Sequence, residues 1–330
     1  LGVIEWFVYL LAAVMFVIGL HLMNSPKTAR KGNMVSAIGM VFAVAMAFIV
    51  LFAGEASNGF KHGVAVIVLI VGIVIGAVAG VVSAKKVKMT DMPQLVSVFN
   101  TVGGGAAALV ALNDILTSAE TPSIVVLITA GLGIMIGSVT FSGSLIAAGK
   151  LQGIKWVKKL SLPGKGFWNI LFAVLTVASF IMLCVQPGQR LLWSVLTTVF
   201  ALCYGLVFVI PIGGADMPVV ISVLNACTGT AVAMSGLAIN NIALIVAGAL
   251  VGAAGVTLSI AMSKAMNRPL LSVLAGGFGG ANAAAGAGEG PEGTMKETSA
   301  DDLAVQLVYA EKVIFVPGFV LAQAQAQREL

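Results

Sequence analysis

Apolar residues dominate the chain in long stretches that short polar segments interrupt. About 20 apolar residues in a helix span the hydrocarbon layer of a bilayer. The pattern predicts nine such helices, at residues 3–23, 34–53, 64–83, 93–116, 123–148, 167–186, 190–211, 217–238 and 242–263. Segments that favour turns separate them, and the shortest, Asn240-Asn241, divides the last two. We therefore expect an all-α polytopic membrane protein.

One ten-residue motif occurs twice, at the start of the fourth and of the eighth predicted span. Residues 91–100 read Asp-Met-Pro-Gln-Leu-Val-Ser-Val-Phe-Asn, and residues 216–225 read Asp-Met-Pro-Val-Val-Ile-Ser-Val-Leu-Asn. Each motif precedes a span of similar texture, in which Gly133, Gly137 and Ser144 correspond to Gly248, Gly252 and Ser259. The sequence thus predicts a two-helix unit that is repeated in parallel.

The two asparagines that end the motifs indicate more than a helix start. An Asp followed by a Pro is a common way to begin a helix, but it does not explain Asn100 or Asn225. Nine residues after the acid, each amide lies about 13 Å deep in the membrane, where a polar group is costly unless it is paired or used. Two explanations stay open: a hydrogen bond between helices, or a transport site at the repeat interface.

The candidate transport site combines these asparagines with nearby hydroxyl groups and the two acids. We expect it to contain Asn100, Asn225, Ser144, Ser259, Ser222, Asp91 and Asp216. The two acids are placed at the mouth, beside the helix N-termini.

Composition and charge agree with a membrane protein. The chain is 59% hydrophobic and only 9% charged, far below the roughly 25% charged residues of soluble domains. Lys and Arg gather at one set of span ends: Lys27, Arg30, Lys31, Lys85, Lys86, Lys88, Lys150, Lys155, Lys158, Lys159, Lys165, Lys264 and Arg268, against Lys61 and Arg190 at the other. Positive loops stay in the cytoplasm, so the N-terminus is predicted outside and the C-terminus inside. The net charge of +5 therefore indicates orientation and no nucleic-acid partner, and the three scattered cysteines indicate no metal site.

The interior of the predicted spans holds no Asp, Glu, Lys, Arg or His. A proton path needs a titratable group or a continuous hydrogen-bonded chain. If protons cross the membrane here, a second subunit is expected to contribute the titratable residue.

The chain changes character after residue 268, and three parts are predicted. Residues 1–268 form a transmembrane domain, residues 269–296 a Gly/Ala-rich hinge and linker, and residues 297–330 a helix, a strand, a glycine turn and a helix. A strand, a glycine turn and a helix in this order are typical of the start of a Rossmann-like α/β domain. About 35 residues cannot bury a core of their own, so either this segment docks on another surface or, as we expect, it is the truncated start of such a domain.

Several motifs resemble one family over nearly the whole chain. They are Ser25-Pro26, Thr28-Ala29-Arg30, Gly32-Asn33, Met92-Pro93, Leu95-Val96, residues 213–225 and 248–252, Lys264-Ala265-Met266-Asn267-Arg268, Val316-Pro317-Gly318 and Ala322-Gln323-Ala324-Gln325. On these residues the chain resembles the β subunit of bacterial proton-translocating NAD(P) transhydrogenase.

The resemblance implies an enzyme that couples hydride transfer between NAD(H) and NADP(H) to proton movement across the bacterial cytoplasmic (inner) membrane. It implies α subunits that bind NAD(H), a second β subunit in a dimer, and NADP(H) on the complete β subunit. The position of Asn100 is His in some members, and members with Asn take the histidine from an α-subunit helix.

Individual residues receive roles from the same resemblance. Asn225, Ser144 and Ser259 match the family's proposed proton path, while Asp216 and Arg268 match residues that couple it to the NADP(H) domain. The hinge to that domain begins at Gly276, Gly277 and Gly279, and its nucleotide fingerprint includes Gly318 and Ala322.

Two other functions remain open at this point. A secondary transporter could bind a small solute or ion with the paired Asn and Ser side chains, and it would move that substrate without nucleotide. A non-catalytic membrane scaffold would tolerate the loss of Asn225.

The nucleotide fingerprint departs from the family at one position. The family reads Gly-Tyr-Gly-Met-Ala, whereas this chain reads Gly-Phe-Val-Leu-Ala at residues 318–322, with Val320 in place of a glycine. A β-branched residue obstructs the approach of backbone to the pyrophosphate. We predict that the chain by itself neither binds NADPH nor catalyses hydride transfer, and saturable NADPH binding in a titration of the purified chain would refute this.

Overall fold

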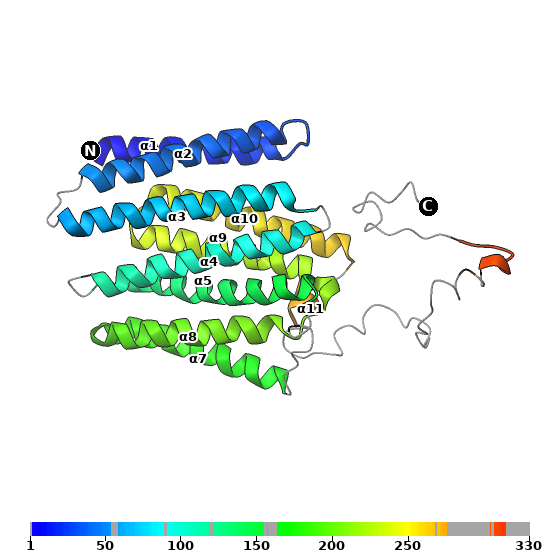
Figure 1. The fold of residues 1–330 in the computed structure, drawn as a ribbon. Coiled ribbons are helices and arrows are strands. Elements are labelled where there is room, and N and C mark those ends of the chain that lie inside the picture. The colour runs from blue at the N-terminus through cyan, green and yellow to red at the C-terminus, as the bar shows by residue number, and fades with distance from the viewer. Residues whose placement is uncertain are drawn as a thin grey trace.

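The fold is a bundle of long helices that lie side by side (Figure 1). The computed structural model describes residues 2–53, 59–88, 91–118, 122–154, 157, 164–267, 269–275, 304 and 307–314. The long helices are α1 (Gly2–Met23), α2 (Ala29–Ala53), α3 (Gly59–Lys86), α4 (Met92–Thr117), α5 (Ile124–Leu151), α7 (Lys165–Val185), α8 (Arg190–Val209), α9 (Met217–Ala238) and α10 (Ile242–Ala265). Short helical turns precede α8 (Pro187–Gln189) and α9 (Gly214–Asp216), and α11 (Leu270–Ala275) follows α10.

The nine long helices confirm the prediction of an all-α polytopic membrane protein. Within the described residues, nine helices are long and apolar enough to cross a membrane. The strand predicted at residues 312–316 is not seen in its described part: residues 312–314 form neither helix nor strand, and residues 315–316 lie outside the described residues. A single strand has no neighbour to pair with, and isolated strands are not stable.

The breaks between helices follow local chemistry. Ser123 and Asn241 cap α5 and α10, because their side chains accept hydrogen bonds from Val126 N (3.4 Å) and Leu244 N (3.1 Å). Asn240 turns the chain with φ of 54°, a left-handed conformation that Asn tolerates better than most residues. The short break between the last two predicted spans is therefore real.

Two buried apolar clusters lie toward opposite ends of the bundle, with polar side chains between them. One cluster includes Ile146 of α5, Val209 of α8, and Met217 and Val219 of α9. The other includes Ile115 of α4 and Leu127 and Ile134 of α5. The buried polar residues between the clusters include Ser97, Asn100, Thr101, Ser138, Thr140, Ser142, Ser144, Ser222, Thr228 and Ser259. The two apolar clusters thus flank a middle that is rich in buried polar side chains, which we call the polar middle.

Glycines bring the central helices into close contact. A Cβ atom built at Gly137 of α5 would lie 2.7 Å from the carbonyl oxygen of Gly104 in α4. In α9 and α10, a Cβ atom at Gly248 would lie 2.6 Å from the carbonyl oxygen of Gly229. Both pairs therefore cross with backbone against backbone, as small residues allow in membranes.

The first three helices lie at the periphery. Tyr9 of α1, Met46 of α2 and Ala243 of α10 form a small apolar cluster that joins the α1–α2 hairpin to α10. None of the side chains described in α3 is buried. A Cβ atom at Gly72, Gly76 or Gly80 would have no neighbour within 4 Å among the described residues.

The crossing of α9 and α10 predicts unequal costs for two neighbouring substitutions. Gly248→Ala would place Cβ 2.4 Å from the backbone nitrogen of Ala233, whereas Gly252→Ala meets nothing closer than 3.5 Å. We expect Gly248→Ala to lower the free energy of unfolding by about 1–3 kcal/mol, because overpacking against backbone cannot relax easily. Gly252→Ala is the matched control and should leave stability unchanged; thermal unfolding in detergent measures both, and equal losses would contradict the crossing.

Candidate functional site

The α4–α5 pair holds its polar groups in a chain of hydrogen bonds. The Ser97 hydroxyl of α4 donates to the carbonyl oxygen of Ser144 in α5 at 2.8 Å, and Asn100 Nδ2 donates to the Ser144 hydroxyl at 2.8 Å. Thr101 Oγ1 donates to the Ser97 carbonyl at 3.0 Å. Asn100 is only 6% exposed, and its Oδ1 atom is buried without a hydrogen-bond partner among the described residues. The site can therefore accept one further hydrogen bond, from a water or from a partner.

The α9–α10 pair has similar serine hydrogen bonds, but its asparagine is not part of them. Ser222 Oγ donates to the carbonyl oxygen of Gly255 at 3.2 Å, and Ser259 Oγ donates to the Ser222 hydroxyl at 3.0 Å. Asn225 is half-buried, and its side chain forms no hydrogen bond with another described residue. The structure thus brings Asn100 together with Ser97 and Ser144, and Ser222 with Ser259, while it leaves Asn225 unpaired within the described part of the chain.

The sequence predicted that Ser259 of α10 corresponds to Ser144 of α5. The contacts place Gly255, one helical turn earlier, at that position instead. Ser97 meets the carbonyl of Ser144, and Ser222, its counterpart in the second motif, meets the carbonyl of Gly255. Gly255, four residues before Ser259, therefore holds the place that Ser144 holds. Gly255 has no side chain for Asn225 to contact, and a Cβ atom there would lie 2.7 Å from the backbone nitrogen of Ala226.

The two motif acids begin α4 and α9 but do not cap them. Neither the Asp91 nor the Asp216 side chain accepts a hydrogen bond from the first turn of its helix, and Pro stands near the start of each helix. Asp91 is exposed and Asp216 is half-buried. Both carboxylates lie at the end of the bundle that carries most of the Lys and Arg side chains, among them Lys27, Lys85 and Lys264. We call this end of the bundle the basic end.

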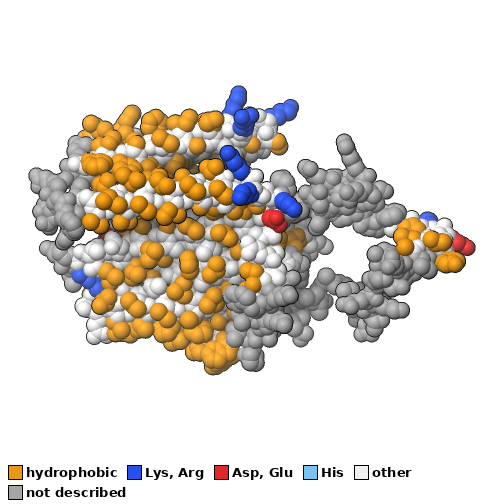
Figure 2. Space-filling view, in the orientation of Figure 1, with side chains coloured by type: hydrophobic (Ala, Val, Ile, Leu, Met, Phe, Trp, Pro, Cys, Tyr) orange, Lys and Arg blue, Asp and Glu red, His pale blue; other side chains and the backbone are white. Residues whose placement is uncertain are grey.

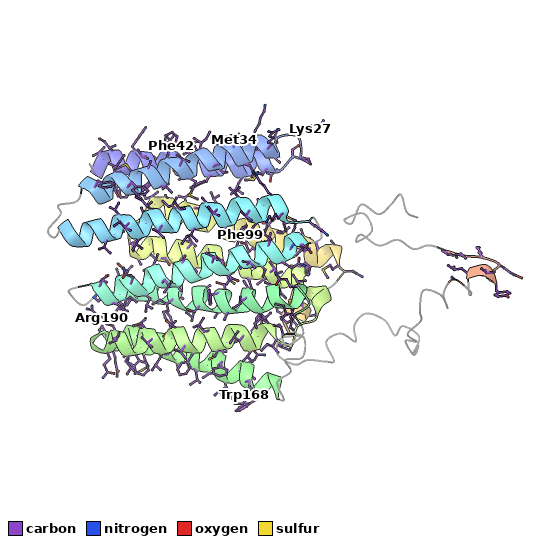
Figure 3. All side chains as sticks on the ribbon, viewed as in Figure 1. Lys27, Met34, Phe42, Phe99, Trp168 and Arg190 are labelled. Atoms are coloured by element: carbon purple, nitrogen blue, oxygen red, sulfur yellow. The ribbon has the colours of Figure 1, made fainter. Side chains whose placement is uncertain are left out.

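Charged side chains mark the two ends and avoid the middle. In Figure 2 the Lys and Arg side chains of this face gather mainly at the basic end, and apolar side chains cover the length of the bundle. Figure 3 places Lys27 and Trp168 toward the basic end and Arg190 at the opposite end. In the described helices, none of the side chains of the polar middle is an Asp, Glu, Lys, Arg or His.

Lys150 binds the last turn of α8 at the basic end, a contact that its sequence position did not predict. Its Nζ atom, at the end of α5, donates to the carbonyl oxygens of Val209 (3.3 Å), Ile210 and Ile212 (2.9 Å). The last carbonyls of a helix lack partners within it and attract cations. Lys150 thus fixes the segment that leads from α8 to Asp216.

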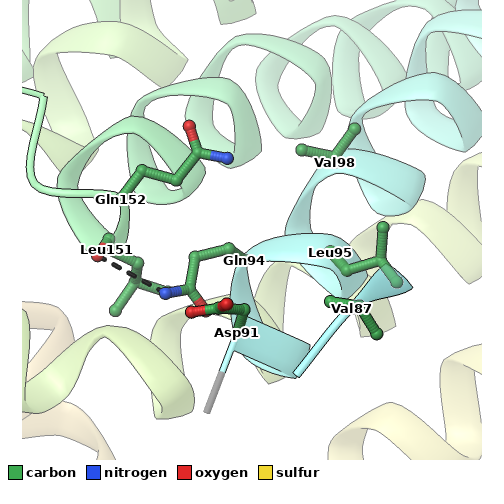
Figure 4. A pocket seen from close by; sticks show the side chains of 7 residues that line it. All are labelled: Val87, Asp91, Gln94, Leu95, Val98, Leu151 and Gln152. Atoms are coloured by element: carbon green, nitrogen blue, oxygen red, sulfur yellow. Dashed lines mark hydrogen bonds between the residues drawn. The ribbon is translucent and has the colours of Figure 1, made fainter. Parts of the chain in front are cut away.

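Gln94 is a second residue that sequence reasoning missed, although a signal was present. It is the first position at which the two motifs differ, since Val219 stands in its place in the second copy. Figure 4 shows Gln94 beside Asp91, with its Nε2 atom 3.5 Å from the carbonyl oxygen of Leu151. The two residues line a cavity at the basic end.

Some expected site residues lie outside the described residues. These are Arg268, the hinge glycines Gly276, Gly277 and Gly279, and the fingerprint residues Gly318 and Ala322. Most of the predicted linker (residues 269–296) and of the predicted nucleotide-domain segment (residues 297–330) also lies outside the described residues. Their roles remain predictions.

The hydrogen bond between Asn100 and Ser144 predicts energetic coupling between the two side chains. In a double-mutant cycle of Asn100→Ala and Ser144→Ala, we expect a coupling free energy of about 0.6 kcal/mol and at most about 1.7 kcal/mol, as for other polar pairs between membrane helices. The control cycle pairs Asn225→Ala with Ser259→Ala, which share no hydrogen bond, and should give none. Unfolding in detergent measures both cycles, and equal coupling in the two would contradict the unequal pairing.

Comparison with known proteins now gives the chain a family. Residues 5–330 match the sequence profile of the NAD(P) transhydrogenase beta subunit. Two curated proteins from Rhodospirillum rubrum, both named NAD(P) transhydrogenase subunit beta, are 40% identical to the chain over 331 residues, which cover 98% of this chain and 68% of each relative. Family profile, identity and nine apolar helices agree, and the chain belongs to the NAD(P) transhydrogenase beta subunit family.

Proposed function

We propose that this transhydrogenase subunit carries protons through the polar middle of its α4–α5 and α9–α10 pairs. The observation that carries the proposal is the buried Asn100–Ser144 hydrogen bond, with an amide oxygen left open to a further donor. Buried polar groups of this kind are satisfied by ordered water, and a row of such waters conducts protons without a charged side chain at every step.

The two helix pairs act as unequal copies of one unit in this proposal. The shared motif, the shared Ser-to-carbonyl contact and the glycine crossing of each pair support a common origin. Asn100 is held by Ser144, whereas in the second pair Gly255 takes the place of Ser144 and offers Asn225 no side chain. Asn100 therefore positions water in a fixed geometry, and Asn225 is free to bind water or a partner side chain in turn.

The titratable group of the path comes from a partner subunit. Asn and Ser side chains order water but do not bind and release protons at physiological pH. A beta subunit implies an alpha subunit, and a membrane helix of that subunit would present a histidine to Asn100. A second β subunit completes a dimer of such units.

The basic end faces the cytoplasm, with the C-terminus on that side and the N-terminus outside. Exposed Lys and Arg side chains at this end, among them Lys27, Lys85 and Lys264, follow the rule that positive loops remain inside. The membrane is the bacterial inner membrane, in which the chain makes several passes.

Coupling to the soluble part of the enzyme passes through α11. Val273 of α11 is 2% exposed and packs in the apolar cluster of the basic end with Met217 and Val219 of α9. The chain leads from there to the glycine hinge at Gly276, and Arg268 precedes α11. A shift of α9 would move α11 and the hinge with it, and so link proton occupancy to NADP(H) affinity.

The nucleotides bind outside the described part of the chain. NADP(H) would occupy the complete β subunit, where it exchanges hydride with NAD(H) on the alpha subunit. No step of the proton path proposed here runs through either nucleotide.

Substitution of the two asparagines in the complete enzyme tests the proposal. In proteoliposomes with alpha subunits and an intact NADP(H) domain, Asn100→Leu and Asn225→Leu should each slow proton pumping at least about tenfold, about 1.4 kcal/mol in activation free energy. A leucine of similar volume cannot order water. Coupled transhydrogenation should fall with pumping, because the two steps share one conformational change.

Thr257→Val is the matched control at similar depth. Thr257 is exposed on α10 and donates only to the Ala253 carbonyl of its own helix at 2.9 Å, so pumping should be unchanged. Full pumping by both asparagine variants would end the proposal and favour a scaffold role. Movement of a solute without nucleotide would favour a transporter instead.

A further inference from the structure

A cavity opens at the basic end where α4 begins and α5 ends. It has a volume of about 390 Å³ and is lined by Val87, Asp91, Gln94, Val98, Leu151 and Gln152, among others (Figure 4). A water molecule takes up about 30 Å³ in the liquid, so the cavity has room for several. Its lining combines a carboxylate and two amides with apolar side chains, and it therefore offers water hydrogen-bond partners.

Gln94 links this cavity to the buried interior. Its Nε2 atom reaches the Leu151 carbonyl at 3.5 Å, while its Oε1 atom is buried and has no hydrogen-bond partner among the described residues. A buried acceptor that lacks a donor costs about 1–3 kcal/mol. Water in the cavity would remove that cost, so the geometry calls for a donor at Oε1.

The polar groups continue from Gln94 along the seam between α4 and α5. Gln94 contacts the carbonyl of Leu151, Ser97 contacts that of Ser144, and Asn100 contacts the Ser144 hydroxyl. Residues three apart in a helix rise about 4.5 Å along its axis, a step that one water molecule spans. The seam thus offers polar partners at every turn from the surface to the polar middle.

The matching seam between α9 and α10 is closed. Val219 stands where α4 has Gln94, and it is fully buried together with Val220 and Met217. Val273 of α11 belongs to the same buried cluster. Apolar side chains therefore occupy the place that the cavity occupies beside α4.

We infer that the polar middle is reached from the basic end along the α4–α5 seam and not along the α9–α10 seam, through a water-filled cavity at Asp91 and Gln94. The entrance takes water and the protons that water carries, and the exposed Asp91 carboxylate at its mouth attracts cations. The inference rests on the proposed proton path for its purpose, but the presence of water beside Gln94 and its absence beside Val219 can be tested separately.

Thiol labelling tests water access without reference to activity. Gln94→Cys and Val219→Cys are made in the complete enzyme with Cys184, Cys203 and Cys227 replaced by Ala, and a membrane-impermeant, water-soluble maleimide is added to vesicles with either face outward. Only a thiolate in contact with water reacts, and a thiol among apolar side chains stays protonated, so Gln94→Cys should react at least about tenfold faster. The reaction should occur from the face that carries the basic end. If Val219→Cys does not assemble, Val220→Cys, also fully buried, takes its place.

The labelling results decide the inference. Slow reaction of Gln94→Cys, or equal reaction of both cysteines, would overturn it. Proton pumping supplies a second readout: Gln94→Leu and maleimide-labelled Gln94→Cys should slow pumping about tenfold, whereas the control Thr257→Val, outside the seam, should retain it. Normal pumping by Gln94→Leu and by labelled Gln94→Cys would show that protons do not enter beside Gln94. If Asn100→Leu still slowed pumping in that case, the proposed proton path would stand without this entrance.

Discussion

Polar groups buried in a membrane must find their partners inside the protein, and this constraint shapes the centre of the bundle. Each unsatisfied group in hydrocarbon costs several kcal/mol. Ser97, Asn100 and Ser144 meet the requirement almost completely, with one amide oxygen left over. That remaining acceptor is a place where a water or a partner side chain gains most by binding.

Close backbone approach makes the polar contacts possible. A serine side chain is short, so it reaches the carbonyl of a neighbouring helix only when the two backbones nearly touch. Gly104 and Gly137 permit this approach between α4 and α5, and Gly229 and Gly248 permit it between α9 and α10. The glycines are therefore part of the polar site, although they contribute no polar side chain to it.

The same crossing makes the two helix pairs unequal. In α10 a glycine stands where α5 has Ser144, and the backbone of Ala226 leaves no room for a side chain there. At the basic end, Val219 and Val273 fill the space that a cavity occupies beside Gln94. Lys150 meanwhile ties α5 to the end of α8. One pair is thus open and polar, and the other is closed and joined to α11.

The sequence by itself determined the membrane class, the nine apolar helices of the described residues and the place of Asn100 along its helix, because these depend on local hydrophobicity and on the rise of a helix. It also indicated the break at Asn240-Asn241, since turn chemistry is local. Only the tertiary structure decided which side chains meet. Matching of identical residues paired Ser144 with Ser259, but the crossing of the backbones places Gly255 opposite Ser222. Likewise, Lys150 resembled an interfacial charge until its partners, about 60 residues away, were in view. Contacts between helices depend on crossing geometry, which no single helix contains.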